Sequence, residues 1–345
     1  MVRKGEFLWA AGSRRATEVK QSAVHPLGSA RSTAGDPVPR PWLRGVGRGY
    51  VALRRLVRQA VIRTPWLDRR ASRALARFEG RLPVRRLLEG VSTGQVQCHG
   101  MTLHYSPEDM GVVSTILLYG DYEPETTRAV LQLLRPGMCC VDLGAHIGYF
   151  SVLAARAVGP SGRVWAFEPV GSTRQMLCFN LAENDVDAIV TVVPRAISDS
   201  SGWVRFSIDQ EDSVSNKMAM PGELDLTTEE VEATSLDEYF AALDWPEVHL
   251  VKMDVEGAEL AALRGMDELC RRNSGLALIF EVNPPNLARQ ELAPERLFEE
   301  LKERGFDSYR VLHRNGIAFP GRDARQIASL GRGDTVNVLA LKGQG

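Results

Sequence analysis

The feature that most constrains the fold of this chain is a short apolar strand that runs directly into a glycine turn and then into a helix. The apolar run predicts a buried strand over 139–143, Gly144 and Gly148 follow in the turn, and 147–158 has the pattern of a helix. Strands and helices alternate on both sides of this unit. Such alternation predicts an α/β fold with a mainly parallel, doubly wound sheet.

This alternation extends from about residue 96 to the end of the chain. The last two predicted strands have no full helix between them, so we expect one of them to run antiparallel. The spacing of Ser235 and Glu238 matches a capping box and predicts a helix that runs toward Leu243. The further predicted strands are 112–119, 164–167, 189–193, 203–208, 249–253, 276–281, 308–313 and 335–341, and the further predicted helices are 124–134, 172–184, 256–266 and 294–304.

The N-terminal part of the chain differs from the rest in charge. Residues 1–90 carry a net charge of +14 and the remainder −15, so a basic extension precedes an acidic globular domain. We predict a disordered basic segment over 1–45, a basic amphipathic helical extension over 46–95, and the globular domain over 96–345. An acidic domain makes nucleic acid an unexpected partner.

The helical extension has two interpretations. Apolar residues from Val51 to Val61 recur at near-helical spacing with arginines between them. Such a helix can lie on an anionic membrane surface, which makes residues 50–90 a candidate peripheral membrane contact. It can equally pack on the domain through its apolar stripe, and we favour packing or partner docking. The Arg-rich segment before it also resembles a transit peptide.

Cysteine usage and hydropathy predict a cytoplasmic protein. The five cysteines form no C-x-x-C pair and no zinc-type spacing, and nothing suggests a disulfide framework. No run of 18 apolar residues is present, and the first ten residues lack the apolar core of a secretory signal. The oligomeric state is left open.

The glycine turn is the first candidate binding site. Glycines permit close backbone approach, and the helix N-terminus that follows offers free N–H groups. The spacing is G-x-x-x-G, because His146 stands where a dinucleotide motif has its middle glycine. A side chain there would crowd a pyrophosphate and suits a smaller ligand, such as an amino-acid tail. Asp142, just before the turn, is placed to hold an ammonium group directly or through water.

Glu168 ends the next predicted strand, 24 residues after Gly144. An acidic residue at this position can accept hydrogen bonds from both hydroxyls of a ribose. The turn and Glu168 together therefore predict a nucleoside ligand.

Carboxylates follow two later strands. Asp254 comes at the end of one, and Glu281 with Asn283 at the end of the next, so the three should share one crevice. They could bind Mg²⁺ or another octahedral cation, or one carboxylate could act as a general base without metal. Glu256 and Glu259 are expected in the first turn of the following helix, where they would complement its dipole.

Two histidines occupy different parts of the predicted fold. His146 lies in the turn and is a candidate catalytic residue as well as a candidate exposed loop residue. His249 starts a strand, away from the carboxyl ends, which favours a structural role.

Six stretches in order resemble the FkbM-like family of S-adenosylmethionine-dependent, class I methyltransferases. The resemblance covers roughly 119–341, and residues 1–95 lie outside it. It implies a seven-stranded Rossmann-like sheet and O-methylation, often of sugar or polyketide hydroxyls in secondary metabolites and glycolipids. The stretches are Gly120-x-Tyr122-Glu123-Pro124, Val141-Asp142-Leu143-Gly144-Ala145-x-Ile147-Gly148-Tyr149, Ala166-Phe167-Glu168-Pro169, Ala196-Ile197-Ser198-Asp199, Thr234-Ser235-Leu236-Asp237 and Lys252-x-Asp254-Val255-Glu256-Gly257-Ala258-Glu259.

The resemblance also implies roles for single residues. The methionine part of the cofactor would lie on the turn, the ribose on Glu168, and the adenine beside 196–199. Asp254, Glu281 and Asn283 match positions where related O-methyltransferases hold a divalent cation, and His146 stands where the family often has Asn. The implied cofactor-binding residues are Glu123, Asp142, Gly144, Ala145, Gly148, Glu168, Ala196 and Asp199, and the candidate catalytic residues are Asp254, Glu281 and His146.

The function that these features favour is S-adenosylmethionine-dependent O-methylation of a small-molecule hydroxyl. Because the sulfonium carbon is already electrophilic, alignment and a deprotonated oxygen would supply most of the chemistry. The loop over 209–226, with Met218 and Met220, could cover the substrate. The alternatives are an NAD(P)-dependent Rossmann oxidoreductase and a non-catalytic partner-binding protein that retains the fold.

Overall fold

The structure is a computed structural model in which the fold can be followed from residue 94 onward. The predicted N-terminal segment, most of the helical extension and nearly all of the 209–226 loop lie outside the described residues, so those expectations stay predictions. The described ranges are 94–106, 109–208, 217–218, 228–312, 320–321 and 335–343.

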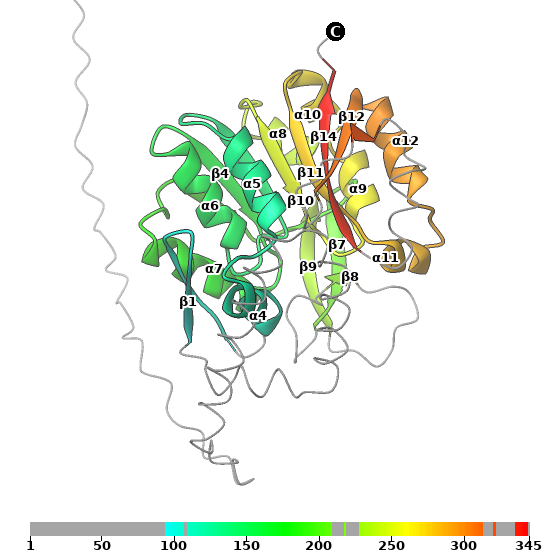
Figure 1. Ribbon diagram of the computed structural model, residues 1–345. Coiled ribbons are helices and arrows are strands. Elements are labelled where there is room, and N and C mark those ends of the chain that lie inside the picture. The colour runs from blue at the N-terminus through cyan, green and yellow to red at the C-terminus, as the bar shows by residue number, and fades with distance from the viewer. Residues whose placement is uncertain are drawn as a thin grey trace, which may run out of the picture. The chain divides into compact units, whose positions relative to one another are not determined.

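A central sheet of seven long strands and one two-residue strand organises the domain (Figure 1). Its order is β13-β12-β14-β11-β10-β3-β4-β5. The five strands from β11 to β5 pair in parallel, and β14 runs antiparallel to both β11 and β12. This confirms the mostly parallel sheet with an antiparallel C-terminal strand. The strands are β3 (Cys139–Leu143), β4 (Arg163–Phe167), β5 (Val190–Val193), β10 (Leu250–Met253), β11 (Ala277–Val282), β12 (Phe306–Leu312), β13 (Pro320–Gly321) and β14 (Val336–Lys342).

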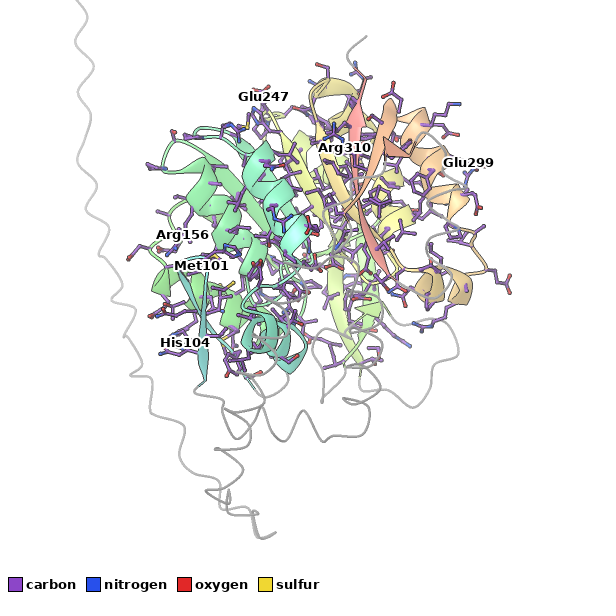
Figure 2. All side chains as sticks on the ribbon, viewed as in Figure 1. Met101, His104, Arg156, Glu247, Glu299 and Arg310 are labelled. Carbon is purple, nitrogen blue, oxygen red and sulfur yellow. The ribbon has the colours of Figure 1, made fainter. Side chains whose placement is uncertain are left out.

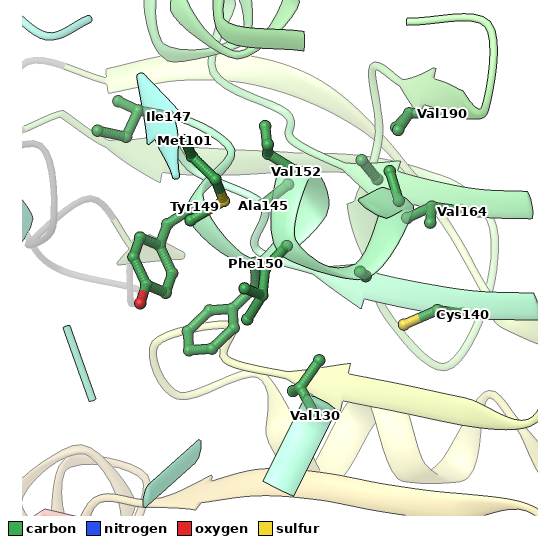
Figure 3. Close-up of a cluster of buried hydrophobic side chains, with 14 of the residues drawn as sticks. Met101, Val130, Cys140, Ala145, Ile147, Tyr149, Phe150, Val152, Val164 and Val190 are labelled. Carbon is green, nitrogen blue, oxygen red and sulfur yellow. The ribbon is translucent and has the colours of Figure 1, made fainter. Parts of the chain in front are cut away.

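The sheet is buried on both faces, which explains why its strands are continuous apolar runs. Successive side chains of a strand point to opposite faces. Ala277 and Ile279 of β11 accordingly join one core cluster, whereas Leu278 and Phe280 join the other. Figure 3 shows the first cluster, with Val130, Cys140, Val152 and Val164 drawn together from two helices and two strands.

The helices divide between these two clusters. The first cluster receives α4 (Met110–Tyr119), α5 (Pro124–Leu133), α6 (Tyr149–Val158) and α7 (Gly171–Glu183). The second receives α8 (Leu236–Ala241), α9 (Glu259–Arg264), α10 (Asp267–Arg272), α11 (Pro284–Arg289) and α12 (Glu295–Glu303). No helix in the described part of the chain is long and apolar enough to cross a membrane.

Two predicted elements are wrong. Residues 112–119, expected as a strand, belong to helix α4, in which Val112 and Ile116 are buried one turn apart. A short apolar run fits either element by periodicity alone. The single helix expected over 256–266 is instead α9, which begins after a turn with Glu256 at φ 48°, followed directly by α10. The break falls at Gly265, where a Cβ would lie 2.3 Å from the carbonyl oxygen of Ser198.

A second, four-stranded sheet has the order β6-β9-β7-β8. The strand predicted over 203–208 is its β7, so this strand exists but lies outside the main sheet. Its partner β9 was missed, because its sequence TEEVEAT is mostly polar. The strands are β6 (Ala196–Ile197), β7 (Gly202–Ser207), β8 (Lys217–Met218) and β9 (Thr228–Thr234).

A hairpin of β1 (Gln95–Cys98) and β2 (Met101–His104) packs on α7 through two buried asparagines. Asn180 accepts from the backbone N–H of His104 at 2.7 Å and donates to its carbonyl at 2.9 Å. Asn184 forms the same pair of bonds with Thr102. These side-chain amides take the place of a second neighbouring strand for β2, which pairs with β1 alone. Arg156, labelled in Figure 2 near Met101, also donates to the carbonyl of Gly100 in the hairpin turn.

We predict that Asn180→Ala lowers the free energy of unfolding by about 2–4 kcal/mol. The substitution removes both bonds to His104 and a third to the Ile147 carbonyl at 2.7 Å, and leaves buried backbone groups unpaired. Urea unfolding measures the change. Gln175→Ala, at an exposed position of the same helix, is the control and should stay within about 0.5 kcal/mol of wild type. Equal stability of the two variants would contradict the conclusion that the hydrogen bonds of Asn180 hold the hairpin on α7.

Candidate active site

A cleft opens at the carboxyl ends of β3, β4 and β10. The chain leaves β3 toward β4 and β5, and later returns to the other side of β3 with β10 and β11, so the strand order reverses at β3. Doubly wound sheets bind ligands at such a switch point. The empty space of the cleft is about 890 Å³ when the solvent at its open mouth is included. Its lining includes the turn 144–147, residues 167–170, residues 195–197 and residues 254–256.

The two glycines of the turn are required by the protein's own packing. At Gly144 (φ 78°) a Cβ would lie 1.9 Å from the carbonyl oxygen of Asp254. At Gly148 (φ 95°) it would lie 2.7 Å from Leu177 Cδ1. Both positions also have a left-handed backbone that favours glycine. Gly144 and Ala145 line the cleft, whereas Gly148 is not among its lining residues and serves as the N-cap of α6.

Glu168 is buried at the end of β4 and lines the cleft. Its Oε2 accepts from the backbone N–H of His146 and its Oε1 from that of Val170, each at 2.9 Å. Burial raises the pKa of Glu168 to about 7, although these two bonds oppose the shift. Each oxygen keeps a further lone pair, so the carboxylate is fixed in orientation and can still accept hydrogen bonds from a ligand.

Asp142 lies beneath the cleft rather than in its lining. Its Oδ2 accepts from Ser151 Oγ at 2.6 Å, and its Oδ1 is buried without a hydrogen-bond partner among the described residues. Burial raises its pKa, and the charge of Lys252 opposes this rise. An orphaned buried acceptor beside the turn fits a cationic group of a ligand.

Lys252 is the residue of this site that the sequence analysis missed. It is 4% exposed in β10, and its Nζ lies 2.9 Å from Asp254 Oδ2 and 4.7 Å from the ring centroid of Phe150. Burial disfavours its charge, but the carboxylates of Asp254 and Asp142 outweigh burial and raise its pKa. A lysine in an otherwise apolar strand, Leu250–Met253, was the available signal, because a buried lysine requires a charged partner.

Asp254, Glu256 and Glu281 form a carboxylate cluster. Each offers an oxygen within 4.8 Å of the others. Burial and the neighbouring Asp254 raise the pKa of Glu256 to about 7 and that of Glu281 well above its usual range. Glu256 also accepts from Asn286 Nδ2 at 2.9 Å. Like charges at this spacing cannot all ionise, so part of the cluster is held neutral and can donate hydrogen bonds.

Asn283, which was expected as the third ligand of a cation, instead caps a helix. Asn283 caps α11: its side-chain oxygen accepts from the N–H of Asn286 at 3.3 Å, and its Nδ2 donates to Glu281 Oε2 at 3.3 Å. Glu256, expected at the start of a helix, stands instead in the cluster. Glu259 does begin α9, but it is buried and accepts from the N–H of Gly257, so it also braces the preceding turn.

The remaining expected residues divide between the cleft and its surroundings. His146 lines the cleft with its Nε2 3.7 Å from Asp109 Oδ1, and burial lowers its pKa. Ala196 lines the cleft, whereas Asp199 is exposed and outside the lining. Glu123 accepts from Asn337 Nδ2 at 2.9 Å, while the adjacent Tyr122 reaches the cleft.

His249 lies at the opposite end of its strand from the cleft. Its Nδ1 accepts from the backbone N–H of Cys139 at 3.1 Å, which joins β10 to β3.

The strand order and the cleft at its switch point define a doubly wound, Rossmann-like fold. Residues 142–308 match the model of the Methyltransferase FkbM domain. This match over residues 142–308 confirms the resemblance seen in the motifs.

Two curated relatives support this assignment. "Methyltransferase 1" of Beauveria bassiana (strain ARSEF 2860) is 28% identical over 145 residues, which are 37% of this chain and 58% of that protein. "Methyltransferase sdnD" of Sordaria araneosa is 29% identical over 157 residues, 37% of this chain and 60% of that protein. The match thus spans about three fifths of the length of each relative.

Solved methyltransferases resemble the chain more loosely. A SAM-dependent O-methyltransferase from Thermotoga maritima has a TM-score of 0.39 and 16% identity, and the match covers 74% of this chain and 81% of that one. Fibrillarin from Aeropyrum pernix has a TM-score of 0.37 and 12% identity, with 62% and 74% covered.

We predict that Gly144→Ala lowers the free energy of unfolding by at least about 3 kcal/mol. The added methyl group meets the Asp254 backbone, which cannot rotate away, and the backbone angle is unfavourable for alanine. Denaturant unfolding followed by circular dichroism gives the value. Gly202→Ala is the matched control, because Gly202 has open space around it and an ordinary φ, and should be neutral or slightly stabilising. If Gly144→Ala were as stable as wild type, the close contact between position 144 and the Asp254 carbonyl would be refuted.

Proposed function

We propose that the protein is an S-adenosylmethionine-dependent O-methyltransferase that acts on a hydroxyl of a small molecule, of the sugar, glycolipid or polyketide type. The observation that carries this proposal is the buried Glu168 carboxylate, which two backbone N–H groups orient at the switch point of an FkbM domain. A carboxylate so placed suits a ribose diol, which the cofactor contains.

The residues present fit this cofactor. Glu168 would hold the ribose, and the apolar Val170, Ala196 and Ile197 would contact the purine. The turn at Gly144 and Ala145, with the orphaned Asp142 Oδ1 beneath it, would take the amino-acid end. When bound, the cofactor supplies an electrophilic methyl group.

The Asp254 carboxylate would receive the proton of the acceptor hydroxyl. Lys252 fixes its orientation through the 2.9 Å bond to Oδ2, and Asp254 remains partly exposed to the cleft. Glu281 lies outside the lining of the cleft, and burial and its neighbours hold it neutral, so it can donate a hydrogen bond within the carboxylate cluster. Tyr122 and Phe150 line the cleft with aromatic rings and reduce the access of water. Positioning and general-base catalysis together supply the rate.

A divalent cation would find hard oxygen ligands at the same place. Asp254, Glu256 and Glu281 would hold it, and it would acidify the acceptor hydroxyl. We propose the metal-free route instead. Asp254 Oδ2 already accepts a hydrogen bond from Lys252, and the side-chain oxygen of Asn283 already accepts one from the N–H of Asn286 as the cap of α11.

The cofactor assignment predicts binding of S-adenosylhomocysteine with a defined pH dependence. Because burial raises the pKa of Glu168 to about 7, its acceptor capacity increases as pH rises through 7. We expect the affinity of the full chain for S-adenosylhomocysteine to increase about tenfold from pH 6 to pH 8, as measured by calorimetry. Glu168→Gln should bind weakly and without this dependence.

The control for this experiment is Glu183→Gln, an exposed position on α7, which should retain wild-type behaviour. NADH is titrated in parallel. Binding of NADH alone would overturn the methyltransferase proposal in favour of an oxidoreductase, and binding of neither ligand by folded protein would favour a non-catalytic role.

The acceptor chemistry predicts large losses from two substitutions. Asp254→Asn removes the proton acceptor and Lys252→Met removes the group that orients it, so each should lower the rate of methyl transfer by about 10²–10⁴-fold. The assay follows methyl-ether formation by mass spectrometry across a panel of sugars, glycolipids and polyketide alcohols.

Three comparisons make the acceptor experiment decisive. Asp244→Asn, an exposed position, should retain full activity. Both active-site variants should still bind S-adenosylhomocysteine, which separates lost chemistry from lost folding. Activity that disappears with a chelator and returns with Mg²⁺ would replace the metal-free route by the cation route.

A further inference from the structure

A second cluster of metal-binding side chains lies outside the cleft. Cys98 ends β1, His99 stands in the β1–β2 turn, and Asp121 belongs to the loop between α4 and α5. One possible ligand atom of each lies within 4.8 Å of the other two. The chain thus brings a thiol, an imidazole and a carboxylate together from segments 22 residues apart.

The contacts within the cluster direct these atoms to one point. His99 Nε2 lies 2.8 Å from Asp121 Oδ1, and the Cys98 thiol donates to the carbonyl of Gly120 at 3.5 Å. The hydroxyl of Tyr149 lies 3.9 Å from Cys98 Sγ and donates to Asp121 Oδ1 at 3.3 Å. Tyr149 therefore touches both the sulfur and the carboxylate from the buried side.

The cluster is closed toward the core and open toward solvent. Cys98 is 4% exposed, whereas the side chains of Asp121 and His99 are 17% and 34% exposed. An ion could reach the cluster from solvent on the side of His99. The hairpin is fixed independently, through Arg156 to Gly100 and through Asn184 to Thr102, so the ligands are held close without the ion.

We propose that Cys98, His99 and Asp121 form a binding site for Zn²⁺ or a similar borderline divalent cation. Thiolate, imidazole nitrogen and carboxylate oxygen are the ligands of tetrahedral zinc, and a sulfur–nitrogen set disfavours Mg²⁺ and Ca²⁺. On binding, a metal–sulfur bond forms and the thiol proton passes to solvent. The bond between His99 and Asp121 is exchanged for coordination of both groups.

The site would fasten one wall of the cleft. Asp121 Oδ1 accepts from the backbone N–H of Tyr122 at 2.9 Å, and Tyr122 reaches the cleft. A cation on Asp121 would tie this loop more firmly to the β1–β2 hairpin, to which the His99–Asp121 pair and the Cys98–Gly120 hydrogen bond already join it. This role is independent of the reaction that the cleft performs.

Cobalt(II) is the probe, because it takes zinc sites and reports its ligands by absorption. Titration of the reduced full chain with Co²⁺ should produce a sulfur-to-cobalt charge-transfer band and the visible bands of a four-coordinate ion, both removed by added Zn²⁺. Cys98→Ser should lose the sulfur band. Cys178→Ser, which removes an exposed cysteine on α7, is the matched control and should keep it.

Two further variants identify the other ligands. Asp121→Asn and His99→Asn should each weaken Co²⁺ binding at least tenfold. Asparagine suits position 99, because it tolerates the left-handed backbone there (φ 49°), and circular dichroism confirms folding. No sulfur band in the wild type, or a band that survives Cys98→Ser, would overturn the proposal. Neither result would affect the S-adenosylhomocysteine titration, which tests the cleft separately.

Discussion

The site depends on the contact between Gly144 and the backbone of Asp254. The end of β10 lies so close to the turn after β3 that no side chain fits between them, and the N–H of Asp254 donates to the carbonyl of Leu143 at 3.1 Å. This contact sets where Asp254 enters the cleft. It also fixes the turn in which the backbone N–H of His146 orients Glu168. One close backbone approach thus positions both carboxylates, and a rigid scaffold of this kind is what placement within a fraction of an ångström requires.

The second constraint is electrostatic and centres on Lys252. A buried ammonium group is costly unless it is paired, and a buried carboxylate is costly for the same reason. Lys252 lies 2.9 Å from Asp254 and also offsets part of the burial cost of Asp142, whose pKa its charge lowers. Removal of the lysine would therefore leave more than one acid uncompensated. The ring of Phe150 beneath the ammonium group keeps water away while still interacting favourably with the charge.

The sequence predicted most of the fold because the parallel strands are long apolar runs that alternate with helices. It failed at α4, where eight mostly apolar residues fit either element, and at β9, where polar residues form a strand on a half-exposed sheet. At the site, strand ends identified Glu168, Asp254 and Glu281, since position along a parallel sheet decides which side chains meet. Local pattern could not show that Asn283 caps a helix, that Glu256 replaces it in the cluster, or that Cys98 and His99 meet Asp121, because these depend on tertiary contacts.

The charge distribution of the cleft is consistent with a cationic ligand. Of the acids in its lining, Asp254 has Lys252 as a partner, whereas Glu168 and Glu256 form no ion pair in the described part of the chain. Burial raises the pKa of both to about 7, so near neutral pH each is poised between a charged and a neutral form. A cation entering the cleft would favour the charged form of both groups. The proposed cofactor carries a sulfonium and an ammonium group against one carboxylate, so its net positive charge would favour the charged forms of Glu168 and Glu256. A neutral hydroxyl acceptor adds no charge to this balance, whereas an anionic acceptor would oppose it.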